Sequence, residues 1–258
     1  MLAFKEQGQG PDLVLLHGFC ETKDIWDPLL PLLQAHFRCI CMDMPGFGAS
    51  DWGHTPFGLA DVAAEVHEFI MHQGLQKPII IGHSLGGYVC LALVEKWPEL
   101  AQAFCLFHSS ALADGEEKKA NRNRTIEFVK KNGVAALVDS FVEGLFYAPN
   151  RARLESEIVD IKKMAAQTPD EVHMAYTAAM RDRPDRTKVL RDFNGPMLFL
   201  AGEEDGAVPF QLSLSQAQLS PQLRFEALPG VGHMGMVEAT QQSAEILLQW
   251  ARENHLCA

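Results

Sequence analysis

The sequence lacks several features that mark whole classes of protein. Its 258 residues contain no apolar run that approaches the roughly 18 residues a membrane-spanning helix needs. The first six residues, MLAFKE, show no basic stretch followed by a long apolar core and a cleavage site, so we see no secretory signal peptide. We therefore expect a cytoplasmic protein without membrane insertion.

Basic residues are also scarce. The chain has 22 Lys and Arg against 33 Asp and Glu, a formal net charge of -11. Nucleic acid and anionic lipid surfaces would be repelled on average. We therefore expect no nucleic-acid partner.

Paired cysteines are missing as well. The six cysteines stand singly in apolar segments, and Cys39 and Cys41 share one face of a predicted strand. Zinc sites usually need Cys-x2–4-Cys together with a second pair of ligands. We expect reduced, mostly buried thiols, no metal site and no cofactor.

Short aliphatic runs alternate with helical patterns along the chain. The apolar runs do not alternate with polar residues, which is typical of strands that are covered on both faces. The runs are Leu13–Leu16, Cys39–Met42, Ile79–Ile81, Phe104–Phe107 and Met197–Leu200. The predicted helices are Pro28–Ala35, Leu59–Gln73, Leu85–Lys96 and Thr240–Glu253. This order predicts an α/β fold with a mostly parallel sheet and helices on both faces.

The alternation stops between residues 111 and 194, which show helical periodicity and no convincing strand. This segment holds 15 basic and 14 acidic residues, whereas the rest of the chain has 7 basic and 19 acidic residues. A compact domain seldom carries so long a loop without structure of its own. We predict a helical cap over 111–194, inserted into a core formed by 1–110 and 195–258.

The strongest chemical signal is Gly82-His83-Ser84-Leu85-Gly86-Gly87, between a predicted strand and a predicted helix. A serine on such a sharp turn exposes its hydroxyl at the carboxyl edge of the sheet. Side chains two residues before or after it would collide with neighbouring backbone, so glycine is expected there. We predict Ser84 as a nucleophile.

A serine nucleophile needs a histidine base, and the imidazole needs an acid to orient it. His233 lies in a Gly-rich loop between a strand-like segment and the last predicted helix. The competing histidines lie in a helical stretch, near helix ends or beside motifs where packing suffices, and His108, directly after a predicted strand, is interpreted as structural. Asp205 follows the strand 197–201, and spacing alone does not separate it from Glu203 and Glu204. We predict Ser84, Asp205 and His233 as the catalytic residues.

These motifs resemble the α/β-hydrolase superfamily, whose chain order is nucleophile, acid, histidine. Further matching segments are His17-Gly18-Phe19, the stretch 43–50, the loop 205–209 and Gly232-His233. The resemblance implies an oxyanion hole formed by the backbone N–H groups of Phe19 and Leu85. Members of this superfamily that displace halide or open epoxides carry aspartate as the nucleophile on the strand–helix turn. Serine at this position, Ser84, therefore favours acyl transfer.

We therefore predict a serine hydrolase that cleaves carboxylic esters of small to medium, largely apolar substrates. Met234, Met236 and Phe19, together with apolar residues of the cap, are the predicted substrate contacts, because ligand pockets are mostly apolar. Arginines of the predicted cap are a further candidate site for an anionic group, although most such side chains are solvated. These are Arg122, Arg124, Arg151, Arg153, Arg181 and Arg183. Two alternatives stay open: a carbon–carbon bond hydrolase with the same triad, and a non-catalytic small-molecule receptor.

Overall fold

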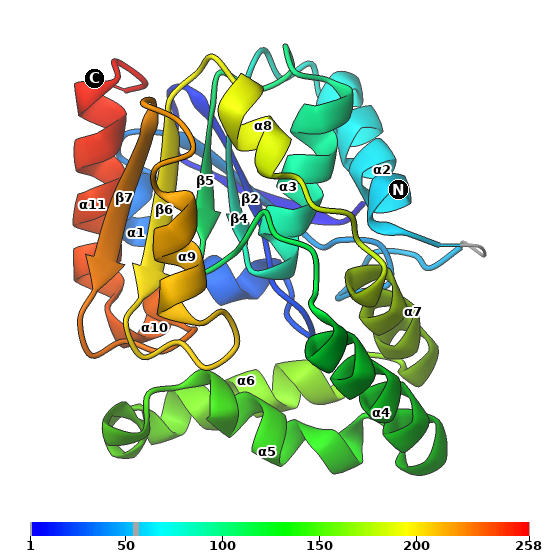
Figure 1. Ribbon diagram of the computed structural model, residues 1–258. Coiled ribbons are helices and arrows are strands. Elements are labelled where there is room, and N and C mark those ends of the chain that lie inside the picture. Colours follow the sequence, from blue (N-terminus) through cyan, green and yellow to red (C-terminus); the bar gives the residue numbers. More distant parts are fainter. Residues whose placement is uncertain (1, 54–56, 258) are drawn as a thin grey trace.

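The centre of the molecule is a seven-stranded sheet (Figure 1). The computed structural model describes residues 2–53 and 57–257. The strand order is β1-β3-β2-β4-β5-β6-β7, and only β1 runs antiparallel to its neighbour. The strands are β1 (Phe4–Gln7), β2 (Asp12–Leu16), β3 (Arg38–Met42), β4 (Ile79–His83), β5 (Ala103–Phe107), β6 (Met197–Gly202) and β7 (Leu223–Leu228). The predicted mostly parallel α/β sheet is confirmed.

Strand β1 was not predicted, and β7 was predicted only as the strand-like segment before the His233 loop, because neither is a continuous apolar run. Strand β1 pairs with β3 at the edge of the sheet, and its burial pattern is mostly exposed. An antiparallel edge strand need not bury both faces, so it lacks the continuous apolar run of the inner strands.

Helices cover both faces of the sheet, as predicted. The helix expected over Pro28–Ala35 is shorter in the structure, while those that begin at Leu59, Leu85 and Thr240 agree closely with their predicted bounds. The helices of the predicted core are α1 (Leu30–Leu33), α2 (Leu59–His72), α3 (Leu85–Lys96), α9 (Phe210–Gln216), α10 (Gly235–Glu238) and α11 (Thr240–Glu253), with one 3-10 turn at Lys23–Trp26.

Alternate residues of the strands feed two separate hydrophobic clusters. Val14 and Leu16 face the cluster that includes α2 and α3, whereas Leu13 and Leu15 face the cluster that includes α1 and α11. This period of two follows from the pleat of a strand. Burial on both faces makes the sheet a rigid platform for the loops at its ends.

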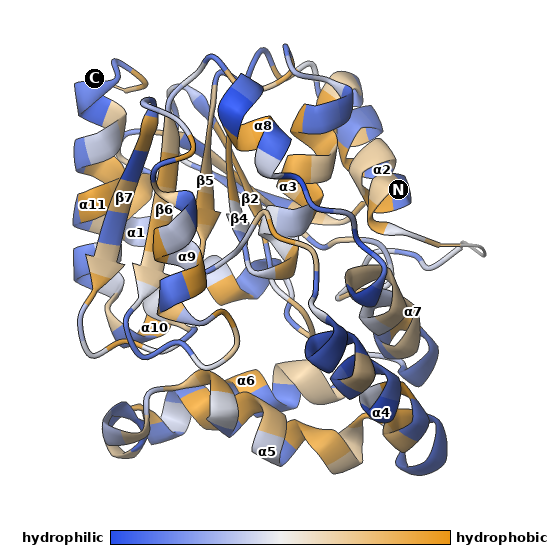
Figure 2. Ribbon diagram, in the orientation of Figure 1, coloured by the Kyte–Doolittle hydropathy of each residue, from blue (hydrophilic) through white to orange (hydrophobic). Residues whose placement is uncertain are grey.

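Five helices connect β5 to β6, with no strand among them. They are α4 (Glu116–Asn132), α5 (Ala135–Leu145), α6 (Glu155–Ala166), α7 (Asp170–Arg181) and α8 (Thr187–Asp192), with a 3-10 helix at Ala148–Leu154. Figure 1 shows α4, α5 and α6 below the arrowheads of the strands, and α8 beside α3 at the other end of the sheet. In Figure 2, α4 is mostly blue because its sequence is largely charged and polar.

Two expectations about the chain as a whole can be compared with the structure. None of the helices in 2–53 and 57–257 is both long and apolar enough to cross a membrane. All six cysteines are unpaired, and five of them are buried. The expectation of free, mostly buried thiols is confirmed.

Candidate active site

Ser84 occupies a strained turn between β4 and α3. Its φ of 48° lies in the left-handed region, which non-glycine residues rarely adopt. A Cβ at Gly82 would lie 2.4 Å from the carbonyl oxygen of Gly86, and a Cβ at Gly86 would lie 2.3 Å from the carbonyl oxygen of Leu16. The two glycines are therefore required for the backbone to pass this closely, and the turn projects Ser84 at the carboxyl edge of the sheet.

His233 and Asp205 come from the loops after β7 and β6 and are hydrogen-bonded to each other. His233 Nδ1 lies 2.7 Å from Asp205 Oδ2. The other oxygen, Asp205 Oδ1, accepts the backbone N–H groups of Ala207 and Val208, each at 2.8 Å. Both oxygens of this buried carboxylate are therefore held in place.

Glu203 and Glu204, the two acids that spacing could not separate from Asp205, have exposed side chains. Burial alone would oppose ionisation of Asp205, but the charge of His233 and hydrogen bonds from His108 and His233 hold the pKa of Asp205 well below its usual range. Asp205 is therefore a permanent carboxylate beside the imidazole.

His108 is a second imidazole beside Asp205. Its Nδ1 lies 3.3 Å from Asp205 Oδ2 and 3.2 Å from the backbone nitrogen of Gly202. Burial outweighs the nearby carboxylate and lowers the pKa of His108 to about 4, so this ring is neutral near pH 7. Its Nε2 is buried and has no hydrogen-bond partner among the described residues.

Among the described residues, His108, Asp205 and His233 form one group whose potential metal-ligating atoms lie within 4.8 Å of one another. The Asp205 oxygen in this group already accepts the short hydrogen bond from His233. The arrangement fits a hydrogen-bonded carboxylate, and we propose no metal there.

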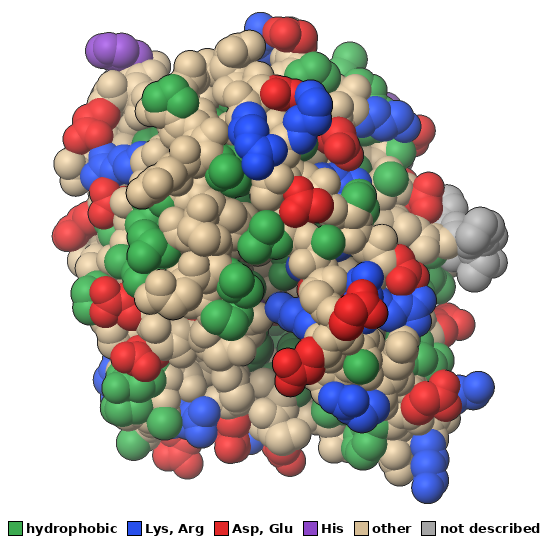
Figure 3. Space-filling view, viewed as in Figure 1, with side chains coloured by type: hydrophobic (Ala, Val, Ile, Leu, Met, Phe, Trp, Pro, Cys, Tyr) green, Lys and Arg blue, Asp and Glu red, His purple; other side chains and the backbone are tan. Residues whose placement is uncertain are grey.

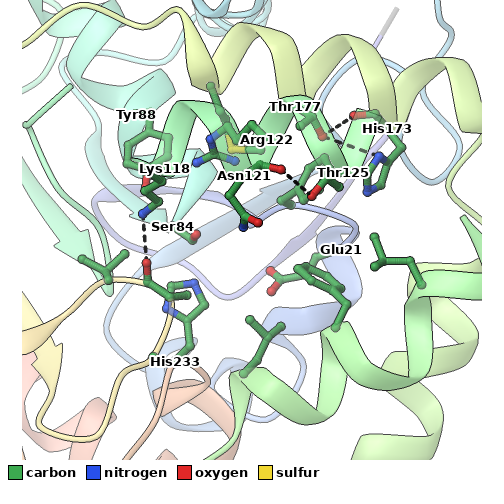
Figure 4. A pocket seen from close by; sticks show the side chains of 18 of the residues that line it. Glu21, Ser84, Tyr88, Lys118, Asn121, Arg122, Thr125, His173, Thr177 and His233 are labelled. Atoms are coloured by element: carbon green, nitrogen blue, oxygen red, sulfur yellow. Dashed lines mark hydrogen bonds between the residues drawn. The ribbon is translucent and has the colours of Figure 1, made fainter. Parts of the chain in front are cut away.

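Ser84 and His233 line the same cavity, which has a volume of about 480 Å³. Figure 4 shows both side chains at one end of this space, with His173 and Thr177 at the other. The apolar lining comes from the loop after β2, from α5 and from α7, and includes Phe19, Leu137, Phe141, Leu145 and Met180. The structure thus brings two of the predicted catalytic residues to one cavity and hydrogen-bonds the third to His233.

The other predicted site residues differ in their positions. Phe19 lines the cavity, and Leu85 is the first residue of α3. Within residues 2–53 and 57–257, the structure gives no hydrogen-bond acceptor for the backbone N–H of either residue. Met234 and Met236 do not line the cavity: both side chains are fully buried in the cluster beside α11. The apolar character of Met234 reflects core packing, which the sequence pattern alone does not distinguish from a pocket lining.

A buried pair, Glu21 and His83, links two loops of the site and was not predicted. Glu21 Oε2 accepts the backbone N–H of Gly18 at 2.7 Å and lies 2.9 Å from His83 Nδ1. His83 Nε2 lies 3.0 Å from the carbonyl oxygen of His233. Both ring nitrogens of His83 therefore face acceptors, which requires a proton on each of them.

The charges of this pair support each other. Burial opposes the charged forms, but the Glu21 carboxylate raises the pKa of His83, and the His83 imidazolium lowers the pKa of Glu21. The available sequence signal was an acid two residues after His17-Gly18-Phe19, in a segment that otherwise predicts burial.

Glu238 is a second buried acid that the sequence did not single out. Its Oε1 accepts the backbone N–H groups of Gly232 and Met234, at 3.0 and 3.2 Å, on either side of His233. Its Oε2 accepts the N–H of Tyr147 at 3.0 Å and the amide of Asn150 at 2.8 Å. Glu238 therefore joins the His233 loop to the segment between α5 and α6.

The strand–turn–helix geometry around Ser84 and the strand order of the sheet are those of the alpha/beta hydrolase fold. The family model described as alpha/beta hydrolase fold matches residues 11–240, and the chain belongs to this family.

Individual relatives cover nearly the whole chain. It is 26% identical to 2-(acetamidomethylene)succinate hydrolase of Mesorhizobium japonicum over 244 residues. This alignment covers 90% of this chain and 84% of that protein. It is 25% identical to pimeloyl-[acyl-carrier protein] methyl ester esterase of Photobacterium profundum, over 95% and 96% of the two chains. A solved thermophilic esterase from Thermogutta terrifontis, with malate bound, is 28% identical, with a TM-score of 0.93 over 98% of this chain and 94% of that one.

Proposed function

We propose that this protein hydrolyses carboxylic esters through an acyl-enzyme formed on Ser84. The observation that carries the proposal is that the serine on the strained turn shares a cavity with His233, whose Nδ1 is hydrogen-bonded to the ionised Asp205. A serine hydroxyl becomes a nucleophile only when a base takes its proton, and this arrangement supplies the base and the group that orients it. The named esterases among the relatives support the same reaction.

In the first step, Ser84 Oγ bonds to the ester carbonyl carbon while His233 Nε2 takes the hydroxyl proton. The C–O bond to the alcohol then breaks, and His233 returns the proton to the departing oxygen. Water attacks the acyl-enzyme with His233 again as base, which releases the acid and regenerates Ser84. Asp205 stays ionised throughout and holds the ring with Nδ1 protonated.

The negative charge that develops on the carbonyl oxygen needs hydrogen-bond donors. We assign this role to the backbone N–H groups of Phe19 and Leu85, which have no acceptor in the described parts of the chain. One such donor contributes roughly 3 kcal/mol to lowering the barrier.

Helices α4, α5 and α7 would form the cap over this chemistry. They supply Lys118, Phe141, Thr177 and other residues to the wall of the cavity that Ser84 and His233 also line. A cavity of about 480 Å³ suits a small to medium ester, and the aromatic and aliphatic side chains of α5 favour an apolar stretch in it.

A fluorophosphonate probe and an ester panel test this function. We expect the probe to label the protein at Ser84, and nitrophenyl esters from acetyl to dodecanoyl to be turned over, with both signals lost in Ser84→Ala. The exposed Ser215 provides the matched control, so Ser215→Ala should keep both.

Other outcomes identify the alternatives. Turnover that survives Ser84→Ala would refute the proposal. Labelling without ester turnover, together with cleavage of diketones, would identify a carbon–carbon bond hydrolase. Labelling with no turnover of either class would identify a receptor.

A further inference from the structure

One face of α4 gives the cavity a polar wall. Lys118, Asn121, Arg122 and Thr125 follow each other at three- and four-residue spacing, and all four line the cavity (Figure 4). Residues at this spacing share a helix face. The cavity therefore has an apolar side, mainly from α5, and a hydrogen-bonding side from α4.

Lys118 carries a charge on this wall, and none of the described acids pairs with it. Its Nζ donates to the carbonyl oxygen of Ala207 at 3.0 Å. No carboxylate in the described parts of the chain forms an ion pair with it. An ammonium has three N–H donors, so two remain for a ligand. Asn121 lies one turn further along α4, and its side-chain NH₂ donates to no other described group.

Neighbouring charges make the polar wall formed by α4 more positive. Arg122 and Arg183 share one carboxylate, that of Asp114, so the three side chains together are cationic. Among the residues that the structure describes, Glu21 is the one acid that lines the same cavity, and His83 already neutralises it.

The other arginines considered as anion sites are used elsewhere. Arg181 pairs with Asp182, and Arg151 and Arg153 donate to backbone carbonyl oxygens. Arg124 lines the adjoining cavity instead. Figure 3 shows blue and red side chains around the hollow on this face. In a chain of net charge -11, an unneutralised cation inside a cavity is the feature that selects for an anion.

The acids of the adjoining cavity face a different space. Asp114, Glu116, Glu117 and Asp185 line that cavity, which shares Lys118 and Asn121 with the first. A carboxylate would therefore bind on the side of Lys118 that faces Ser84, where none of these four acids lines the wall.

We propose that Lys118 and Asn121 bind a carboxylate on the substrate, so that the preferred esters are half-esters of dicarboxylic acids. The ester carbonyl lies at Ser84, the methylene chain packs along Phe19 and Phe141, and the free carboxylate accepts from Lys118 Nζ and Asn121 Nδ2. The substrate class rests on the proposed ester hydrolysis. The binding of a carboxylate does not.

Matched esters test the substrate class. Monomethyl esters of linear dicarboxylic acids from succinate to suberate are compared with methyl esters of monocarboxylic acids of the same chain length, with acid release followed in a pH-stat. We expect kcat/KM to favour the half-esters, with an optimum at one chain length. Lys118→Gln should lower the ratio of half-ester to neutral-ester kcat/KM by about 10- to 100-fold, since a charge-assisted hydrogen bond is lost.

Lys130→Gln is the matched control, because Lys130 is exposed on the same helix and does not line the cavity. It should leave the ratio unchanged. A ratio that moves less than about twofold in Lys118→Gln, or equally in both variants, would overturn the carboxylate site while leaving ester hydrolysis intact.

A binding measurement separates the two proposals. In the Ser84→Ala protein, calorimetry should detect binding of adipate, and adding Lys118→Gln should weaken it by about tenfold or more. If neither ester series is hydrolysed above the Ser84→Ala background, the proposed function fails. The calorimetry still tests whether Lys118 binds a carboxylate. Adipate binding that is equally strong with and without Lys118→Gln would refute the carboxylate site.

Discussion

The two sides of the cavity are built in opposite ways. The loops at the carboxyl ends of the strands hold Ser84, Asp205 and His233 through buried hydrogen bonds from several directions. On the facing wall, Lys118 and Asn121 project from α4 with one or two contacts each and remain partly or fully exposed.

This difference separates reaction chemistry from recognition. Groups that stabilise charge in a transition state act best when they are already oriented, because no reorganisation is then needed during the reaction. Side chains on an exposed helix face can change without disturbing the sheet below. We therefore expect substitutions near the strand ends to reduce rate or stability, and substitutions on α4 to change substrate choice.

The largest effect should come from Asp205→Asn. The amide is isosteric but favours the wrong tautomer of His233, so kcat for ester hydrolysis should fall by about 10³- to 10⁴-fold. Glu204→Gln, in the exposed acid next to it, should have little effect. Steady-state kinetics on one neutral ester measures both. Equal, small losses in the two variants would remove Asp205 from the mechanism.

Glu238→Gln should have the next largest effect. Glu238 accepts four hydrogen bonds, and the amide nitrogen of Gln cannot accept those of Tyr147 and Asn150. We expect the free energy of unfolding to fall by about 2–4 kcal/mol, because buried donors lose their partner. We also expect a roughly tenfold lower kcat, because the His233 loop is less well held.

Urea unfolding and kinetics check this expectation. Glu245→Gln, at an exposed position of α11, is the control. A variant that unfolds like the wild type would show that Glu238 does not stabilise the His233 loop.

Local patterns explain why most of the fold could be predicted from the sequence. The inner strands are short apolar runs, and the glycines next to Ser84 indicate a turn between a strand and a helix. Both signals can be recognised from neighbouring residues alone. Strand β1 was not predicted, because an exposed edge strand has no continuous apolar run.

The site was less predictable because its contacts join distant residues. Glu203, Glu204 and Asp205 are consecutive, and only the three-dimensional course of the loop decides which one contacts His233. Glu21 and His83 are 62 residues apart, and Glu238 meets Tyr147 across 91 residues. No local spacing encodes such pairs.

The Glu21–His83 pair predicts a pH-dependent contribution to stability. The lowered pKa of Glu21 stabilises the fold above its ordinary value of 4.5, and this contribution is lost as pH falls through the lowered pKa. The raised pKa of His83 stabilises the fold below its ordinary value of 6.5, and this is lost as pH rises through the raised pKa. The pair therefore contributes most between these two values.

Glu21→Gln should test that window. We expect the variant to be about 1–3 kcal/mol less stable than the wild type between pH 4.5 and 6.5, with a smaller difference at higher and lower pH. Urea unfolding from pH 3 to 9 measures it, with the exposed Glu68→Gln as control. A difference that is the same at every pH would show that the pair is not ionised in the folded protein.

The smallest effect should come from Met234→Leu, next to His233 on the strand-end side. Met234 is fully buried among core side chains and does not line the cavity. A swap of similar volume should cost less than about 1.5 kcal/mol of unfolding free energy, and KM for neutral esters should not change. Phe141→Leu, in a residue of α5 that does line the cavity, should instead alter KM. If Met234→Leu moved KM as much as Phe141→Leu does, the boundary between core and cavity would lie closer to His233 than the structure places it.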